Sequence, residues 1–177
     1  TMTHTASLAG GAAASKAFLK RLGIVEVDSV AVFLETLKLL HMIGTLGGNN
    51  VSSISCSGGE AGLMADLFED TQAHFREFSI TQNQILKDIL GPIVSIANPL
   101  DYHTFIWDNY EALEATYSAV LADGFDLNML VMDVPPPPRC DDAAWQKPLK
   151  AVIAAKRKTG APTILLTTLA ENLTEAV

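Results

Sequence analysis

The chain has 177 residues, of which 49% are hydrophobic and 18% are charged. This length and apolar content suit one compact domain, or one domain with an appended segment, and they exclude a disordered tail. The formal net charge is −8, and the basic residues form no stripe along the sequence. We therefore expect neither a nucleic acid partner nor binding to an anionic membrane surface.

The cysteine content and the hydropathy pattern indicate a cellular compartment. Two cysteines are fewer than a secreted domain of this size usually carries. No apolar run reaches the roughly 18 residues of a membrane span, and the first residues do not have the pattern of a signal peptide. We expect a soluble, cytoplasmic protein. Thr1 stands where an initiator methionine is usual, so we also expect the chain to be a fragment or a subunit of something larger.

A glycine- and asparagine-rich stretch, Gly44–Asn50, predicts a linker between residues 1–45 and residues 46–177. Two helices are expected before it, at Gly11–Leu22 and Val30–Met42. Asp28 and Ser29 are alternative N-caps of the second helix. The short stretch Ile24–Val27 between the helices fits a strand.

Strand-like and helix-like runs alternate after the linker. Strands are expected at 51–56, 77–80, 93–97, 127–134 and 163–169, and helices at 58–73, 82–90, 109–122 and 143–158. Pro148 lies inside the last of these helices and should kink it or delay its start. The alternation predicts an α/β fold in which crossover helices cover both faces of a parallel sheet, preceded by the mostly helical segment.

The segment Ser57-Gly58-Gly59 joins the first expected strand of this region to a helix. Small residues at a helix N-terminus let an anion approach the backbone N–H groups, so these three residues are a candidate phosphate site. The alternative is a capping box, with Ser57 as N-cap and Glu60 three residues later. Both readings stay open at the level of sequence.

His4 lies among small hydroxyl residues ahead of the first helix. A neutral imidazole can act as a nucleophile toward phosphorus or as a base. The alternative is a solvated terminus. The remaining histidines and both cysteines lack metal-ligand spacing, so no metal site is expected.

Two later segments are candidates for a substrate pocket. Asn98 and Asp101 follow an expected strand, where open α/β sheets place ligands. Arg139 and Cys140 follow a run of four prolines after the most apolar strand. The alternatives are an Asx or proline turn in the first segment and a structural turn before a capped helix in the second.

Together these segments resemble the NDP-forming acyl-CoA synthetases, the superfamily of succinyl-CoA synthetase and ADP-forming acetyl-CoA synthetase. Residues 1–45 resemble the C-terminal part of a first succinyl-CoA-ligase-like domain, and Thr3–Gly10 matches its phosphohistidine segment. Residues 46–177 resemble the second such domain, which has a flavodoxin-like fold. Its motifs match at Ser57–Gly59, Ala65-Asp66, Asn98–Asp101 and Arg139–Asp142.

The resemblance implies an acid–thiol ligase. Such an enzyme interconverts acyl-CoA, ADP and phosphate with a carboxylic acid, CoA and ATP, through an acyl phosphate and a phosphohistidine. It implies His4 as the catalytic residue, Ser57, Gly58 and Gly59 as phosphate ligands, and Asn98, Asp101, Arg139 and Cys140 as candidate pocket residues. CoA, ATP or ADP and Mg²⁺ are implied for the complete enzyme, and none is expected to bind this chain alone.

The resemblance also implies partners. These are a CoA-binding Rossmann-like domain and an ATP-grasp domain, each of which is either part of the same chain or a separate subunit. The implied substrate is a small carboxylic acid. A homodimer is compatible with the resemblance. The alternative function is a non-catalytic flavodoxin-like module that binds a partner or an anion.

Overall fold

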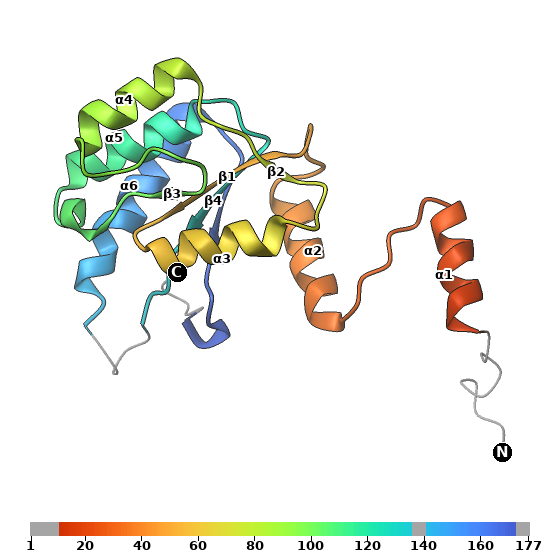
Figure 1. Cartoon of the computed structure of the whole chain (residues 1–177). Coiled ribbons are helices and arrows are strands. Elements are labelled where there is room, and N and C mark those ends of the chain that lie inside the picture. The colour runs from red at the N-terminus through yellow and green to blue at the C-terminus, as the bar shows by residue number, and fades with distance from the viewer. Residues whose placement is uncertain (1–10, 136–140, 173–177) are drawn as a thin grey trace. The chain divides into compact units, whose positions relative to one another are not determined.

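The computed structural model describes residues 11–135 and 141–172. Contacts divide the chain into two units, Thr1–Thr45 and Leu46–Val177. Each is described by itself (Figure 1).

The first unit contains two helices, α1 (Ala12–Arg21) and α2 (Val30–Met42). Ser29 is the N-cap of α2, because its Oγ accepts a hydrogen bond from the N–H of Val32 at 3.1 Å. The strand expected at residues 24–27 is wrong, since that stretch forms no ladder. No described residue of this unit is buried, so neither helix has a core of its own here.

The second unit alternates strands and helices as the sequence predicts. Its elements are β1 (Asn50–Ser55), α3 (Gly58–Phe68), β2 (His74–Phe75), α4 (Ile80–Leu90), β3 (Leu100–Asp101), α5 (Tyr110–Leu121), β4 (Leu127–Val131), α6 (Ala143–Thr159) and β5 (Thr163–Leu166). Two short 3₁₀ helices, Thr104–Ile106 and Ala170–Asn172, follow β3 and β5.

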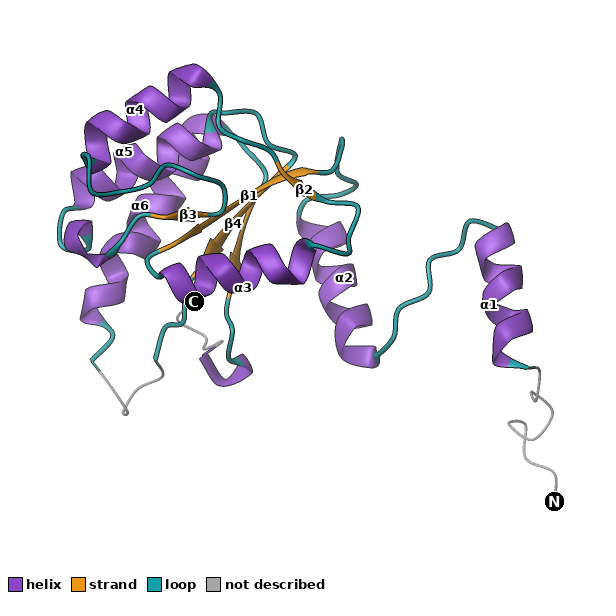
Figure 2. Ribbon diagram, in the orientation of Figure 1, coloured by secondary structure: helices purple, strands orange, loops and turns teal. Residues whose placement is uncertain are grey.

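All strand pairs are parallel, which confirms the predicted α/β class. The sheet order is β2-β1-β4-β5, and β3 also pairs with β1. Because β4 occupies one edge of β1, β2 and β3 share the other edge, one beside its start and one beside its end. Helix α3 covers one face of the sheet, and α4, α5 and α6 lie on the other (Figures 1 and 2).

Two predicted strands are wrong. Residues 77–80 lead into α4, which begins at Ile80 with Ser79 Oγ accepting from the N–H of Gln82 at 3.2 Å. Residues 93–97 form no ladder. The sheet contains the two-residue strands β2 and β3 instead, which are too short to show a periodic pattern in a sequence.

The side chain of Asn98 fills the gap between β2 and β3 along the edge of β1. Its Oδ1 accepts from the N–H of Ser53 at 3.1 Å, and its Nδ2 donates to the carbonyl of Val51 at 2.9 Å. The same Nδ2 donates to the carbonyl of Arg76 at 2.8 Å. One amide group therefore replaces a residue of a neighbouring strand, which satisfies backbone groups that would otherwise be unpaired.

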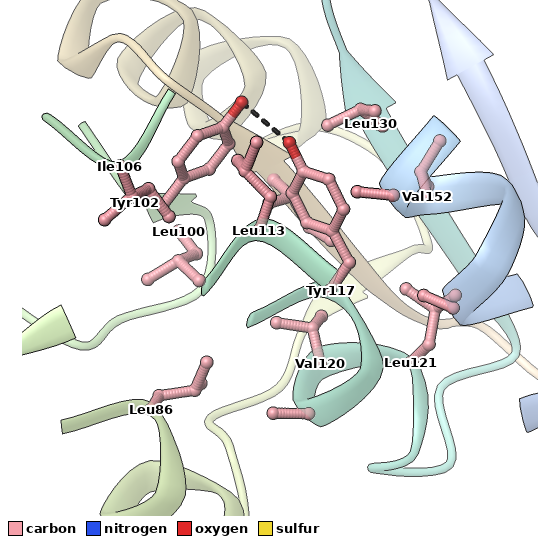
Figure 3. Packing of buried hydrophobic residues seen from close by; sticks show 14 of the residues in the cluster. Leu86, Leu100, Tyr102, Ile106, Leu113, Tyr117, Val120, Leu121, Leu130 and Val152 are labelled. Carbon is pink, nitrogen blue, oxygen red and sulfur yellow. Dashed lines mark hydrogen bonds between the residues drawn. The ribbon is translucent and has the colours of Figure 1, made fainter. Parts of the chain in front are cut away.

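The main core lies between the sheet and the helices α4, α5 and α6. Leu113, Tyr117, Val120 and Leu121 of α5 are at most 1% exposed, which confirms the predicted apolar face of that helix. Tyr117 donates its hydroxyl hydrogen to the hydroxyl oxygen of Tyr102 at 2.8 Å (Figure 3). The two rings meet edge to face, with centroids 5.5 Å apart, a preferred aromatic geometry.

Pro148 does not delay the start of α6, which begins five residues earlier at Ala143. Because proline has no N–H, the carbonyl of Ala144 lacks its usual helical donor four residues later. The indole Nε1–H of Trp107 donates to that carbonyl at 2.7 Å. The proline thus creates the acceptor that fixes Trp107 on α6.

Candidate functional site

The carboxyl ends of β1 and β4 lie side by side at the point where the order of the sheet reverses. From β1 the chain moves to β2 and β3 on one edge, and it then returns across the sheet to β4 and β5. In doubly wound sheets ligands bind in the crevice at such a switch point.

A cavity of about 490 Å³ opens at this switch point. Cys56 and Glu60 line it from the segment after β1, and Met132 and Asp133 line it from the segment after β4. Thr104, Trp107 and Trp145 complete the lining. The volume falls within the range of pockets that bind small molecules.

The start of α3 lies beside this cavity, and the capping-box prediction is wrong. Ser57 occupies the N-cap position with an extended backbone, but its side chain caps no N–H group. Among the described residues, none accepts a hydrogen bond from the backbone N–H of Gly58, Gly59 or Glu60. These donors are free to bind an anion, which favours the phosphate interpretation.

We expect the substitution Ser57→Ala to change the free energy of unfolding by less than about 0.5 kcal/mol, because no capping bond is lost. Ser79→Ala is the matched variant, since Ser79 Oγ caps α4, and it should cost about 1 kcal/mol. Urea unfolding followed by circular dichroism measures both. An equal cost for the two serines would contradict the uncapped start of α3.

Two carboxylates lie close to the start of α3. A Cβ atom built on Gly58 would come within 3.3 Å of Asp101 Oδ2, so a glycine permits this close approach. Asp101 Oδ1 accepts from the N–H of His103 at 2.9 Å. Oε2 of Glu60 is buried and has no partner among the described residues. Burial raises the pKa of Glu60, and the charges of Asp133 and Asp101 raise it further.

The thiol of Cys56 lines the cavity. Burial raises its pKa to about 11, and the neighbouring charge of Glu60 adds to the shift. Hydrogen bonds from its own backbone and from Tyr102 act in the opposite direction but are smaller. Because a thiolate is the nucleophilic form, this upward shift of the pKa disfavours a nucleophilic role for Cys56.

Asp133 connects the end of β4 to the segment after β5. Its Oδ1 accepts from the N–H groups of Thr168 and Leu169 at 3.0 and 3.1 Å and from Nδ2 of Asn172 at 3.1 Å. Its Oδ2 accepts from the Thr168 hydroxyl. Burial alone would raise the pKa of Asp133, but these hydrogen bonds outweigh it and hold the pKa below its ordinary value.

The residues predicted for the site do not all meet. Ser57, Gly58, Gly59 and Asp101 lie together at the start of α3. The side chain of Asn98 instead forms hydrogen bonds with backbone groups of β1, and it does not line this cavity. His4, Arg139 and Cys140 lie outside the described residues.

Sequence reasoning missed most of the cavity wall. Thr104, Trp107, Met132, Asp133 and Trp145 were not predicted as site residues. Asp133 had a usable signal, because it follows the most apolar strand and strand ends carry ligands. The strand was expected to extend to residue 134, so Asp133 was assigned to the strand itself, whereas β4 ends at Val131.

Two negative findings concern the described residues alone. Residues 11–135 and 141–172 contain no group of three or more histidine, cysteine, aspartate or glutamate side chains placed to hold a metal ion. None of the helices in these ranges has the length and apolar character needed to cross a membrane.

The fold is that of a doubly wound α/β domain with a cavity at its switch point. No family model matches the sequence. The chain is 31% identical over 99 residues to an ADP-forming acetate–CoA ligase of Methanocaldococcus jannaschii, covering 56% of this chain and 14% of that protein. It is 26% identical over 121 residues to a trans-feruloyl-CoA synthase of an unknown prokaryotic organism, and this match covers 68% of this chain and 17% of that protein.

Solved structures of acetyl-coenzyme A synthetase 1 from Candidatus Korarchaeum cryptofilum have the same fold. The complex with phosphate and ADP gives a TM-score of 0.79 at 22% identity, covering 99% of this chain and 37% of that one. The apo form gives a TM-score of 0.78 at 21% identity, covering 97% of this chain and 37% of that one.

These relatives confirm the predicted resemblance to the NDP-forming acyl-CoA synthetases. The chain spans 14% to 17% of the length of the two curated relatives.

Proposed function

We propose that this chain is part of an NDP-forming acyl-CoA synthetase. The complete enzyme would interconvert acyl-CoA, ADP and phosphate with a carboxylic acid, CoA and ATP. The observation that carries the proposal is the start of α3, where three consecutive N–H groups have no acceptor among the described residues, at the switch point of the sheet. Sequence similarity to an ADP-forming acetate–CoA ligase supports it.

In the proposed reaction phosphate attacks the thioester carbonyl and displaces the CoA thiolate, which forms an acyl phosphate. A ring nitrogen of His4 then attacks phosphorus, and the carboxylate leaves. An oxygen of ADP finally takes the phosphoryl group from His4. Ser57, Gly58 and Gly59 would hold the phosphoryl oxygens through backbone N–H groups, since a helix N-terminus stabilises negative charge without a cation.

We assign CoA, the nucleotide and its Mg²⁺ to partner domains of the Rossmann-like and ATP-grasp classes. The lack of any buried residue in the described part of the first unit fits a segment that packs on further chain. The chain spans 37% of the solved acetyl-CoA synthetase chains.

We expect the full-length protein to become labelled when it is incubated with γ-³²P-ATP and Mg²⁺, and His4→Ala to lose that label. The reason is that the phosphoryl group has no acceptor nitrogen in the variant. A phosphohistidine is recognised by its lability in acid and its stability in base.

His103→Ala and His41→Ala are the matched controls. The ring of His103 lies beside Asp101, whose carboxylate is close to Gly58 at the start of α3. His41 lies in the last turn of α2. Both should keep the label. Full labelling of His4→Ala would reject the role of His4.

A specific observation favours the alternative, a non-catalytic module of flavodoxin-like fold. The carboxylates of Asp101 and Glu60 lie near the start of α3, and like charges oppose phosphate binding. Such a module would form no phosphohistidine in the full-length protein, so the same labelling experiment separates the two functions.

A further inference from the structure

Resting on the proposed function, we propose that His103 is a further catalytic residue, which takes the proton of the phosphate that attacks the thioester. Asp101 is its positioning residue. Both lie at the end of β3, beside the carboxyl end of β1, where Ser55 pairs with Asp101 in the parallel ladder.

His103 has a backbone conformation that is almost restricted to glycine. Its φ is 61° and its ψ is 165°, and no other non-glycine residue among those described has a positive φ. A side chain in this region costs free energy, and such residues cluster at functional sites, where the surrounding structure holds them. The strain therefore indicates a function for the imidazole.

The chain is anchored on both sides of His103. The N–H of Tyr102 donates to the carbonyl of Ser55 at 2.9 Å, and the Tyr102 side chain is 1% exposed. After His103 the 3₁₀ helix Thr104–Ile106 begins, and Ile106 is buried in the core. The backbone at His103 thus cannot relax unless buried side chains move.

The imidazole of His103 lies against a carboxylate and an aromatic ring. Its Nδ1 is 3.8 Å from Asp101 Oδ2, and its ring stacks on Phe105 with centroids 5.8 Å apart. Hydrogen bonds between catalytic groups are often long before a substrate binds. A proton on Nδ1, the nitrogen that faces Asp101, leaves a lone pair on Nε2, so the imidazole can act as a base.

Asp101 places this pair of residues at the start of α3. Its Oδ2, the oxygen that faces His103, would be 3.3 Å from a Cβ atom built on Gly58. Gly58 is one of the residues to which the proposed function assigns the phosphoryl oxygens. A carboxylate beside an anion site is unfavourable by itself. An imidazolium that forms next to Asp101 during proton transfer offsets this charge.

The proposed step conserves atoms and charge. Nε2 of His103 takes the proton of HPO₄²⁻ while a phosphate oxygen forms a bond to the thioester carbonyl carbon and the C–S bond breaks. The imidazolium then gives the proton to the CoA thiolate. The products are the acyl phosphate and the CoA thiol, and His103 is neutral again.

Arsenate in place of phosphate isolates this step, because an acyl arsenate hydrolyses at once and needs neither ADP nor His4. The assay measures the CoA thiol that the full-length protein releases from acetyl-CoA, octanoyl-CoA and cinnamoyl-CoA without nucleotide. On the thioester that the native protein cleaves fastest, His103→Ala should lower kcat about a hundredfold, with KM for arsenate changed less. His103→Gln should lose as much, because an amide cannot carry the proton.

His74→Ala is the matched control for this assay. His74 pairs with Asn50 at the start of β1, the end of that strand opposite to Ser55, so its loss should leave the rate of CoA release unchanged. A native rate in His103→Ala or in His103→Gln would overturn the acid–base role.

His103→Gly separates the function of the imidazole from its effect on the fold. Both His103→Gly and His103→Ala lack the imidazole, so both should release CoA slowly. Because only glycine adopts this backbone conformation without strain, the glycine variant should unfold at a higher urea concentration than the alanine variant. Equal midpoints, or a lower midpoint for the glycine variant, would contradict the strain at His103.

The two proposals fail in different ways. His103→Ala should keep the label from γ-³²P-ATP, because transfer from ATP to His4 does not use the thioester step. A labelled protein that releases CoA without need of His103 would reject the acid–base role and keep the relay. An unlabelled protein whose release of CoA in arsenate depends on His103 would reject the relay and keep His103. A native protein that cleaves none of the three thioesters would overturn both.

Discussion

Replacing Asn98 with alanine should lower the free energy of unfolding by about 3 kcal/mol, because a buried donor and a buried acceptor are left unpaired. The N–H of Ser53 and the carbonyl of Val51 lose their hydrogen-bond partner on the edge of β1. The carbonyl of Arg76 also loses the hydrogen bond that it accepts from Asn98. Val51 and Ser53 are at most 3% exposed, so water cannot replace the amide easily.

Urea unfolding at constant pH measures this loss. Asn98→Asp keeps the shape but turns the Nδ2 donor into an oxygen facing two carbonyls, so it should cost at least as much as alanine. Asn109→Ala is the graded control, since Asn109 makes one exposed capping bond to the N–H of Ala112 at 3.0 Å and should cost about 1 kcal/mol. A cost for Asn98→Ala no larger than that of Asn109→Ala would contradict its role in the sheet.

Replacing Asp133 with alanine should cost about 2 kcal/mol at pH 7, because hydrogen bonds to a charged acceptor are stronger than neutral ones. The loss would free the segment around Thr168 and Leu169 from the end of β4. Asp108→Ala is the control. Its carboxylate is 92% exposed and pairs with Lys147, so we expect a cost between 0 and about 1 kcal/mol.

The contribution of Asp133 to the free energy of unfolding should decrease at acidic pH. Its pKa in the folded protein lies below the ordinary value of 3.8, so the stabilisation is complete above the unfolded pKa. It is lost as the pH falls through the folded pKa. The stability difference between the native protein and Asp133→Ala should therefore be constant near neutrality and shrink below about pH 4.

Asp133→Asn separates charge from shape. An asparagine oxygen can still accept from Thr168, Leu169 and Asn172, so most of the stability should remain at pH 7. The pH dependence below 4 should disappear, because an amide does not titrate. An unchanged pH profile in Asp133→Asn would assign the dependence to another carboxyl group.

The candidate site was only partly accessible to sequence reasoning. Ser57, Gly58 and Gly59 could be found because a strand, two glycines and a helix follow one another locally. Trp107 and Trp145 lie 38 positions apart in sequence, and they meet because α6 packs against the segment after β3. No local pattern marks such a pair, since each tryptophan fits an apolar core position equally well.

The sequence by itself determined the α/β class, the parallel sheet and the buried face of α5. These follow from the spacing of apolar residues, which reflects burial along one element at a time. Only the tertiary structure decided that Asn98 replaces a strand residue, that Ser57 leaves α3 uncapped, and that Trp107 and Trp145 line one cavity with residues that follow β1 and β4. The first and the last of these depend on contacts between residues far apart in the chain, and a local pattern of hydrophobicity carries no information about which distant groups will meet. The missing cap is local, but the residue types of a capping box occur at Ser57 and Glu60 whether or not its hydrogen bonds form.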